Sequence, residues 1–599
     1  MPVLTRTEGA FGEALVSVLR RLTESAGFSY STIMLLQLKV VWGMWALRDM
    51  TPGDTSSYFV SAYTWFTAGR ALISWSPLYV SFYGSLLHLS TDAFLVTLLH
   101  RLLIVFALAI LILAVMRRLL PADIAWFMTA WWVVMPIDFD AMYEVHLFAV
   151  IPLMIAVLLI VGEPARLRRG LAFGCLLATA LLVRNEILVA TAMLMLAAAT
   201  AGAWRIHSVR QWPRVRLSPI LAYSLPVGAA CLLTFYYYRH ASDAQALSAM
   251  LERKHTLNVC QVYAFGYQQR NDDFKKSPWT DCQELMTRVY GVPEPSLLSA
   301  LRRNPRAMIT HFLWNLRLVP AGLQVLLFNA TSSSVTPDYV PVVNSSIAIP
   351  ASLLLLGVVA AGLTRLLKDR RRWWQTTLRE RRWGWATLLA VGCVTFGVMI
   401  TQRPRPSYMF TLGILLRAAT GTLCLVLLDN TVWRRRIAGA FPVAAVLLIV
   451  LAPIYRQFTH EARPRYLAAA YERLRESERI VERPGTVFMT PGYGLELCDY
   501  VGKGKCAPRD YFALRAEVEA GATWMAVLAD HGVNLVYANE LVFAEPAGQR
   551  LVTELQSDGW RTLGMLDEGD RRWILMSKPD ASTSASAAGF PCSLRASAL

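Results

Sequence analysis

Charged residues are scarce in this chain of 599 residues. Asp, Glu, Lys and Arg together make up 17% of it, whereas hydrophobic residues make up 55%. A soluble protein of this size carries more charge, about a quarter of its residues. The composition therefore excludes an ordinary soluble multidomain protein. It favours a polytopic membrane protein whose core lies largely in the bilayer.

Acidic residues are fewer than basic ones, at 42 against 59, which gives a formal net charge of +17. Such an excess can indicate nucleic-acid binding, so the distribution of the basic residues decides the matter. The densest basic cluster, residues 365–382, lies between two apolar segments. Loops on the cytoplasmic side of membrane proteins concentrate Lys and Arg in this way. We therefore expect membrane lipids as partners and no nucleic acid.

The nine cysteines include no pair with the C-x2-C spacing of zinc sites. Cys260 with Cys282, and Cys498 with Cys506, fall in two polar regions that we expect outside the membrane. An oxidising bacterial periplasm permits such pairs to form disulfides, and metal binding is the alternative. Internal repeats are absent as well. Their absence argues against a transporter.

Long apolar runs fill the chain from residue 31 to residue 454. They predict a polytopic α-helical membrane protein with about 11 transmembrane helices. Residues 1–30 would be a cytoplasmic N-terminal segment, and the first helix would cover residues 31–47. Two large external loops are predicted, at about 49–91, where many aromatic residues suit interfacial helices, and at 239–345.

The composition becomes that of a soluble domain near residue 455. Short apolar strands alternate with helical patterns, which predicts a small extracytoplasmic α/β domain over residues 455–578. The expected strands are 486–489, 533–538, 560–566 and 572–576, the last two forming a hairpin. Residues 579–599 are rich in Ala and Ser and are predicted to be disordered.

Asp54 follows Pro52-Gly53 just after the first apolar segment. A carboxylate on such a turn can cap the next helix by accepting backbone N–H bonds. At a lipid–water boundary it can also act as a base. Both interpretations of Asp54 stay open from this stretch alone.

A second acidic cluster follows the third apolar segment and contains Asp138, Asp140, Glu144 and His146. Carboxylates with an imidazole suit a divalent cation such as Mg or Mn that bridges phosphate. Alternate residues point in different directions on regular structure, so only an irregular turn would bring them together. Asp138, Asp140 and His146 are the candidate metal ligands.

Three arginines are candidates for binding phosphate, because a guanidinium matches two phosphate oxygens at once. Arg403 and Arg405 lie where an apolar segment is expected to leave the membrane. Lipid headgroups are the alternative partners of these two. Arg184 interrupts the apolar run 170–203, with Glu186 close by. That carboxylate can neutralise Arg184 and make the two a structural pair.

The placement of these residues resembles the glycosyltransferase C superfamily, which includes aminoarabinose transferases, protein O-mannosyltransferases and arabinofuranosyltransferases. The resemblance rests on Asp54 in the first external loop, on Asp138 and Asp140 at the exit of the third span, and on the C-terminal domain. It implies an inverting glycosyltransferase that moves a monosaccharide from a polyprenyl-phosphate donor to an acceptor hydroxyl. Asp54 would be its catalytic base.

The acceptor implied by this resemblance is a glycan, a lipid or a protein, and the location is the bacterial inner membrane with the C-terminal domain in the periplasm. The Trp-Trp-Asp motif of oligosaccharyltransferases is absent, so en bloc transfer to asparagine is not expected. An O-antigen ligase or polymerase is the first alternative function. A membrane transporter is the second.

Overall fold

The computed structural model describes residues 21–47, 54–70, 76–135, 144–162, 165–209, 217–241, 247–278, 281–329, 345–373, 375, 378–429, 444, 446, 448–450, 452, 454–455, 485–491, 495–568 and 571–579. The chain forms two compact units. The first unit comprises Met1–Arg48 and Ser61–Ala462, and the second comprises Asp49–Val60 and Arg463–Leu599. The division falls within the first external loop predicted from the sequence.

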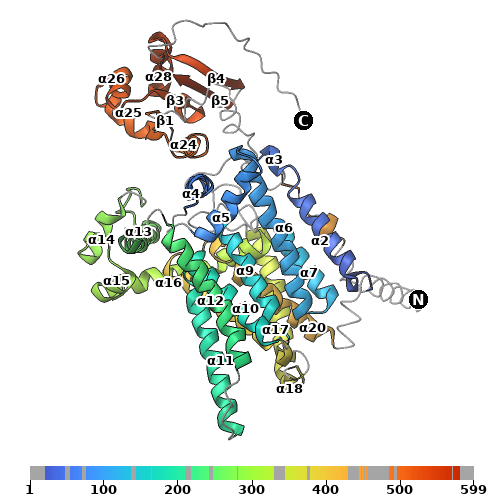
Figure 1. Ribbon diagram of the computed structural model, residues 1–599. Helices are drawn as coiled ribbons and strands as arrows, with labels where there is room; N and C mark the ends of the chain where they lie inside the picture. Colours follow the sequence, from blue (N-terminus) through green and yellow to red (C-terminus); the bar gives the residue numbers. More distant parts are fainter. Residues whose placement is uncertain are drawn as a thin grey trace. The chain divides into compact units, whose positions relative to one another are not determined.

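The described part of the first unit is helical (Figure 1). Its helices are α2 (Ala26–Val40), α3 (Met44–Leu47), α4 (Asp54–Ala68, which begins in the second unit), α5 (Pro77–Ser85), η2 (Leu86–His88), α6 (Ala93–Leu119), α7 (Ala122–Val133), α9 (Glu144–Ile160), α10 (Arg166–Leu182), α11 (Ile187–Val209), α12 (Leu217–Arg239), α13 (Leu247–Gln268), α14 (Cys282–Tyr290), α15 (Leu297–Arg303), α16 (Pro305–Phe328), α17 (Ser345–Lys368), α18 (Arg370–Trp373), α19 (Arg379–Thr401), η4 (Pro406–Tyr408) and α20 (Phe410–Leu428).

Four helices of the described residues are long and apolar enough to cross a membrane. They are α6, residues Ala348–Lys368 of α17, α19 and α20. The α9 helix and residues Ile187–Ala201 of α11 are apolar but shorter. This supports a membrane protein. The predicted number of about 11 spans is not reached among the residues that the structure describes.

Two expected spans have a different form in the structure. The first, predicted over residues 31–47, is divided between α2 and α3, with Gly43 between them at a φ of 89°. The third is represented by α7, whose 12 residues rise only about 18 Å at 1.5 Å per residue. By contrast, the interruption predicted at residues 184–186 does separate two helices, α10 and α11.

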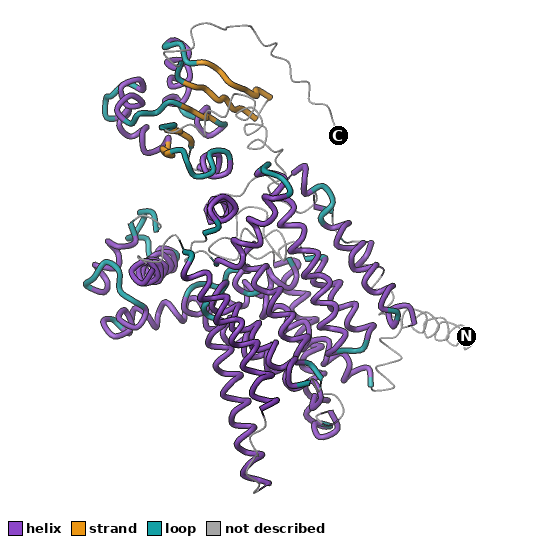
Figure 2. The backbone as a smooth tube through the Cα atoms, in the orientation of Figure 1, coloured by secondary structure: helices purple, strands orange, loops and turns teal. Residues whose placement is uncertain are grey.

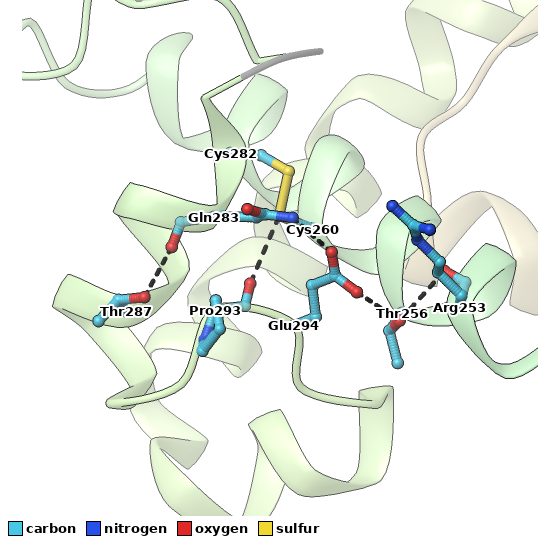
Figure 3. Close-up of a disulfide and its surroundings, with 8 residues drawn as sticks. All are labelled: Arg253, Thr256, Cys260, Cys282, Gln283, Thr287, Pro293 and Glu294. Atoms are coloured by element: carbon cyan, nitrogen blue, oxygen red, sulfur yellow. Dashed lines mark hydrogen bonds between the residues drawn. A yellow bond between two sulfur atoms is a disulfide. The ribbon is translucent and has the colours of Figure 1, made fainter. Parts of the chain in front are cut away.

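The polar region after α12 forms a small helical cluster of α13, α14 and α15 that continues into α16. Figure 3 shows the disulfide between Cys260 of α13 and Cys282 of α14. Glu294 accepts hydrogen bonds from Thr256 at 3.2 Å and from Gln283 at 2.5 Å beside this disulfide. A buried cluster that includes Tyr263 and Met286 surrounds the two cysteines. The second external loop is thus a folded element with its own core.

The second unit is built on a five-stranded sheet with the strand order β2-β1-β3-β5-β4, drawn in orange in Figure 2. Its strands are β1 (Val487–Thr490), β2 (Ala507–Asp510), β3 (Leu535–Ala538), β4 (Arg561–Glu568) and β5 (Arg571–Ser577). The first three are parallel, and β5 pairs antiparallel with both β3 and β4. Four strands match the predicted segments, and β2 was not predicted.

Five helices accompany this sheet: α24 (Leu495–Tyr500), α25 (Tyr511–Glu519), α26 (Trp524–Asp530), α27 (Glu540–Phe543) and α28 (Pro546–Ser557). The core of the second unit gathers around Trp524, which is fully buried and stacks on Tyr511 at a ring distance of 5.4 Å. The indole N–H of Trp524 donates to the carbonyl of Ala547 at 2.8 Å. The aromatic core therefore ties α25, α26 and α28 together.

Candidate functional site

A cleft with an empty volume of about 410 Å³ lies in the first unit. It is lined by four groups of residues: His146, Ala149, Val150 and Leu153 of α9; Arg184, Glu186 and Ile187 at the turn between α10 and α11; Thr395 and Val398 of α19; and Ser407, Tyr408, Phe410 and Thr411 from η4 and the start of α20. About half of these side chains are apolar. A few polar groups converge among them, which is the usual character of a ligand site.

The break between α10 and α11 brings Arg184 to this cleft. Helix α10 ends at Leu182, and the backbone N–H of Arg184 donates back to the carbonyl of Thr179 at 2.8 Å. The carbonyl of Arg184 then accepts from the N–H of Ile187 at 3.1 Å as α11 begins. This tight turn satisfies the backbone groups and holds the arginine at the junction of two apolar helices.

The guanidinium of Arg184 meets three side chains in the cleft. Its Nε donates to Glu186 Oε1 at 2.6 Å, and its Nη1 lies against the imidazole ring of His146. It also lies over the ring of Tyr408 at 5.5 Å. The pair with Glu186 that the sequence suggested does exist. The same guanidinium nevertheless lines the cleft, so pairing does not remove it from a ligand.

Helix α16 holds the loop between α19 and α20 through hydrogen bonds and close packing. Asn315 of α16 donates to the carbonyls of Ile400 at 2.9 Å and Gln402 at 2.7 Å. A side chain at Gly322 would meet the carbonyl oxygen of Pro404 at 2.8 Å, so only glycine permits this approach. Contacts with Asn315 and Gly322 of α16 therefore hold the first half of this loop.

Arg403 and Arg405 are both buried, but they have different neighbours. The guanidinium of Arg403 lies over the ring of Phe265 in α13 at 5.5 Å. Arg405 lies close enough to His146 to act on it electrostatically, as Arg184 does. Arg405 thus lies near a residue of the cleft, although it is not among the lining residues. The structure gives Arg403 an aromatic contact instead, so the two predicted phosphate ligands are not equivalent.

Ser407 is a cleft residue that the sequence interpretation missed. Its side chain is 4% exposed and lines the cleft, and its hydroxyl has no hydrogen-bond partner among the described residues. A buried hydroxyl without a partner is costly unless a ligand or water satisfies it. The only sequence signal was its place two residues after Arg405, directly before Tyr408.

The metal site predicted at Asp138, Asp140 and His146 is not supported at His146. Both ring nitrogens of His146 are within hydrogen-bond reach of Arg184 Nη1, and Arg405 adds a second positive charge nearby. Two guanidinium groups disfavour a divalent cation there. No group of three His, Cys, Asp or Glu residues suits a metal within the described ranges. Asp138 and Asp140 lie outside those ranges, so their role stays a prediction.

Asp54 is the first residue of α4. The position agrees with the Pro-Gly turn that precedes it in the sequence, and its side chain lies outside the described parts. Neither helix capping nor a role as base is tested by the backbone alone. The residues that follow, Thr55 and Ser56, are each 2% exposed, so α4 begins in a buried setting.

No protein-family model and no curated protein matches this chain. Among solved structures, the apo oligosaccharyltransferase of Archaeoglobus fulgidus is similar with 11% identity and a TM-score of 0.44, over 86% of this chain and 69% of that one. The AglB oligosaccharyltransferase of Archaeoglobus fulgidus, in complex with an inhibitory peptide and a dolichol-phosphate, has 10% identity and a TM-score of 0.40, over 91% and 73%.

ArnT from Cupriavidus metallidurans, bound to undecaprenyl phosphate, is similar with 11% identity and a TM-score of 0.35, over 91% of this chain and 96% of that one. Because these scores and identities are low, no residue role is taken from them. The roles below rest on the side chains of this chain.

Proposed function

We propose that this protein is a membrane glycosyltransferase that moves a monosaccharide from a polyprenyl-phosphate donor to an acceptor hydroxyl. The observation that carries the proposal is the cleft that Arg184 and Ser407 line beside apolar side chains. A lipid phosphate needs cations and hydroxyl donors for its oxygens and apolar surface for its chain. These groups occur together in the cleft.

The arginines have a defined task in such a reaction. As the bond from the sugar to the phosphate breaks, negative charge develops on the departing phosphate, and preorganised guanidinium groups stabilise it. Arg184 is held by Glu186 and Tyr408, so its guanidinium is oriented before a ligand arrives. Ser407 supplies a hydroxyl to the same anion. His146 contacts the same guanidinium and also orients it.

Asp54 is proposed as the general base that takes the proton of the acceptor hydroxyl. The acceptor oxygen then attacks the anomeric carbon from the face opposite the phosphate, the bond to the phosphate oxygen breaks, and the configuration inverts. The support is the position of Asp54 at the start of α4, directly after the first apolar segment. Asp138 and Asp140 are proposed as the acidic residues that would bind Mg or Mn if the reaction uses one.

The proposed location is the bacterial inner membrane, with the cleft and the C-terminal domain on the periplasmic side. Two disulfides, Cys260–Cys282 and Cys498–Cys506, support an oxidising location for both polar regions that contain them. The acceptor is proposed to be a glycan, a lipid or a protein of the cell envelope. The O-antigen ligase and transporter alternatives are outcomes of the test.

The proposal is tested by supplying undecaprenyl-phosphate sugars carrying a radioactive label to the purified protein in nanodiscs with membrane acceptors. We expect labelled product from the native protein and, at equal folded yield, none from the Asp54→Asn variant. Arg372→Ala is the control for the loss of a charged side chain outside the cleft, because Arg372 pairs with Asp429 at 3.0 Å and does not line the cleft. Failure of the native protein to consume any donor would contradict the proposal.

A further inference from the structure

The first half of α4 packs within the second unit, against a loop closed by a disulfide. Residues Asp49–Val60 belong to that unit together with Arg463–Leu599. Ser56 Oγ donates to Asp499 Oδ2, and the ring of Phe59 lies 4.9 Å from that of Tyr500. Asp499 and Tyr500 are consecutive residues of α24. One short helix of the C-terminal domain therefore contacts α4 with two adjacent side chains.

A third contact comes from the other end of the same loop. Gly504 has a φ of +72°, and a side chain there would meet Val60 Cγ1 at 2.7 Å. Residues 56, 59 and 60 are spaced three and four apart, so they lie on one face of α4. The loop thus covers a continuous face of the helix over its first two turns.

The contacting loop, residues 498–506, is restrained by a disulfide that joins its two ends. The disulfide joins Cys498 of α24 to Cys506, directly before β2, and both sulfurs are buried. Strand β2 in turn pairs with β1 in parallel register over four residues. Inside the loop, the N–H of Lys505 donates to the carbonyl of Gly502 at 2.8 Å. The sheet, the disulfide and the loop form one support for α4.

Asp499 is the polar centre of this contact. Burial raises the pKa of its carboxyl, and the hydrogen bond from Ser56 opposes part of the rise. A half-buried carboxylate that accepts a hydroxyl hydrogen bond gives a directional contact, which the packing of Phe59 and Val60 alone does not. The hydrogen bond therefore adds a directional contact to the first half of α4.

We propose that Asp499 is a positioning residue that acts through Ser56 to hold the start of α4, and that the Cys498–Cys506 disulfide is required for this contact. The consequence for catalysis, the correct placement of Asp54 two residues before Ser56, rests on the function proposed above. The anchoring itself does not. The C-terminal part of the second unit thereby holds residues 56–60, which lie near the beginning of the chain.

Hydrogen exchange in the full-length protein tests the anchoring. Asp499→Ala and Ser56→Ala should each speed exchange of the amides of residues 55–60 about tenfold, as expected for loss of one hydrogen bond to a carboxylate. Asp499→Asn should keep them slow, because the amide oxygen still accepts from Ser56. The amides of β1, β3 and β5 should not change. Unchanged exchange in α4, or equally faster exchange in the sheet, would overturn the proposal.

The second disulfide of the chain provides the control for the first. Replacing Cys498 and Cys506 together by Ser should speed exchange in residues 55–60. The same double replacement at Cys260 and Cys282 removes a disulfide from the α13–α14 cluster and should leave these amides protected. If both double variants affect α4 alike, the disulfide acts through general stability, and its specific role is refuted.

The catalytic consequence is measured in the sugar-transfer assay. Asp499→Ala should lower kcat about tenfold with little change in KM for the donor, as expected when a base is misplaced, and Asp499→Asn should restore it. Faster amide exchange in α4 with an unchanged kcat would overturn the positioning role. If the native protein transfers no sugar, the proposed function fails, while the exchange experiment still decides whether Asp499 anchors α4.

Discussion

Two arginine–glutamate pairs among the described residues of the first unit lie in contrasting surroundings. Arg101 Nε of α6 lies 2.5 Å from Glu144 Oε1 of α9, and the side chains are 5% and 4% exposed. Arg184 Nε lies 2.6 Å from Glu186 Oε1, and these side chains are 19% and 28% exposed. The bond lengths are nearly the same. The access to a ligand is not.

The difference separates a structural pair from a pair suited to binding. Arg101 and Glu144 join two helices, and burial prevents either side chain from exchanging its partner. The ion pair of Arg184 with Glu186 lies within one turn, and both residues line the cleft. An anionic ligand can therefore share the guanidinium of Arg184. Distance alone does not reveal function, whereas exposure and connectivity do.

The largest expected effect is on stability. Glu144→Ala leaves the buried guanidinium of Arg101 without its carboxylate, which typically costs about 3–5 kcal/mol. We expect a large fall in the thermal unfolding temperature of the purified protein. Glu186→Ala is the matched control, and its cost should stay below about 1 kcal/mol because that pair is more exposed. Equal losses in the two variants would remove the distinction between the pairs.

The second effect is on binding. Arg184→Ala should weaken the affinity for undecaprenyl phosphate about 30-fold to 100-fold, the loss expected for hydrogen bonds to a charged group. Its unfolding temperature should stay close to that of the native protein. Affinity is measured by titrating the lipid into nanodiscs that carry the protein. A variant that binds the lipid as tightly as the Arg372→Ala control would show that Arg184 is structural.

A smaller binding effect is expected at the hydroxyl of the cleft. Ser407→Ala should lower the affinity for undecaprenyl phosphate about fivefold, since one neutral hydrogen bond contributes about 1 kcal/mol. The variant should be at least as stable as the native protein, because it removes a buried hydroxyl that has no partner among the described residues. Loss of stability without loss of affinity would contradict a ligand role.

The smallest expected effect is on the pH dependence of stability. It concerns Asp499, whose carboxylate accepts a hydrogen bond from the hydroxyl of Ser56 and not from a guanidinium. Burial raises the pKa of Asp499 in the folded protein. Between the ordinary pKa and this raised pKa, the folded protein therefore binds a proton that the unfolded chain has released. Asp499 therefore favours folding most at low pH, and this contribution falls as the pH rises from the ordinary pKa through the raised one. The unfolding temperature of Asp499→Asn should lack this decline. Identical pH profiles would contradict the prediction.

Local patterns in the sequence predicted much of the fold. The polar residues Arg184, Asn185 and Glu186 could not continue an apolar helix, and they mark the break between α10 and α11. The two short apolar segments on either side of residue 569 predicted the β4–β5 hairpin. The two disulfides join the cysteine pairs expected from their places in polar regions. Each of these features depends on residues close together in the chain.

The features that escaped prediction depend on residues far apart. Ser56 and Asp499 are separated by 443 positions, so neither side chain indicates the other. Strand β2 reads Ala-Pro-Arg-Asp, which has no strand pattern, and it forms because the Cys498–Cys506 loop delivers it to the edge of β1. Arg403 has different neighbours from Arg405 because its guanidinium lies over Phe265 of α13. Tertiary packing decided all three.

The most direct measurement of the central claim is an electron cryomicroscopy structure of the protein in nanodiscs with undecaprenyl phosphate. The account predicts the lipid phosphate in the cleft, within hydrogen-bond distance of the Arg184 guanidinium and the Ser407 hydroxyl, with the prenyl chain along the apolar wall of α9. A phosphate bound elsewhere, with Arg184 still paired only with Glu186 and His146, would contradict it.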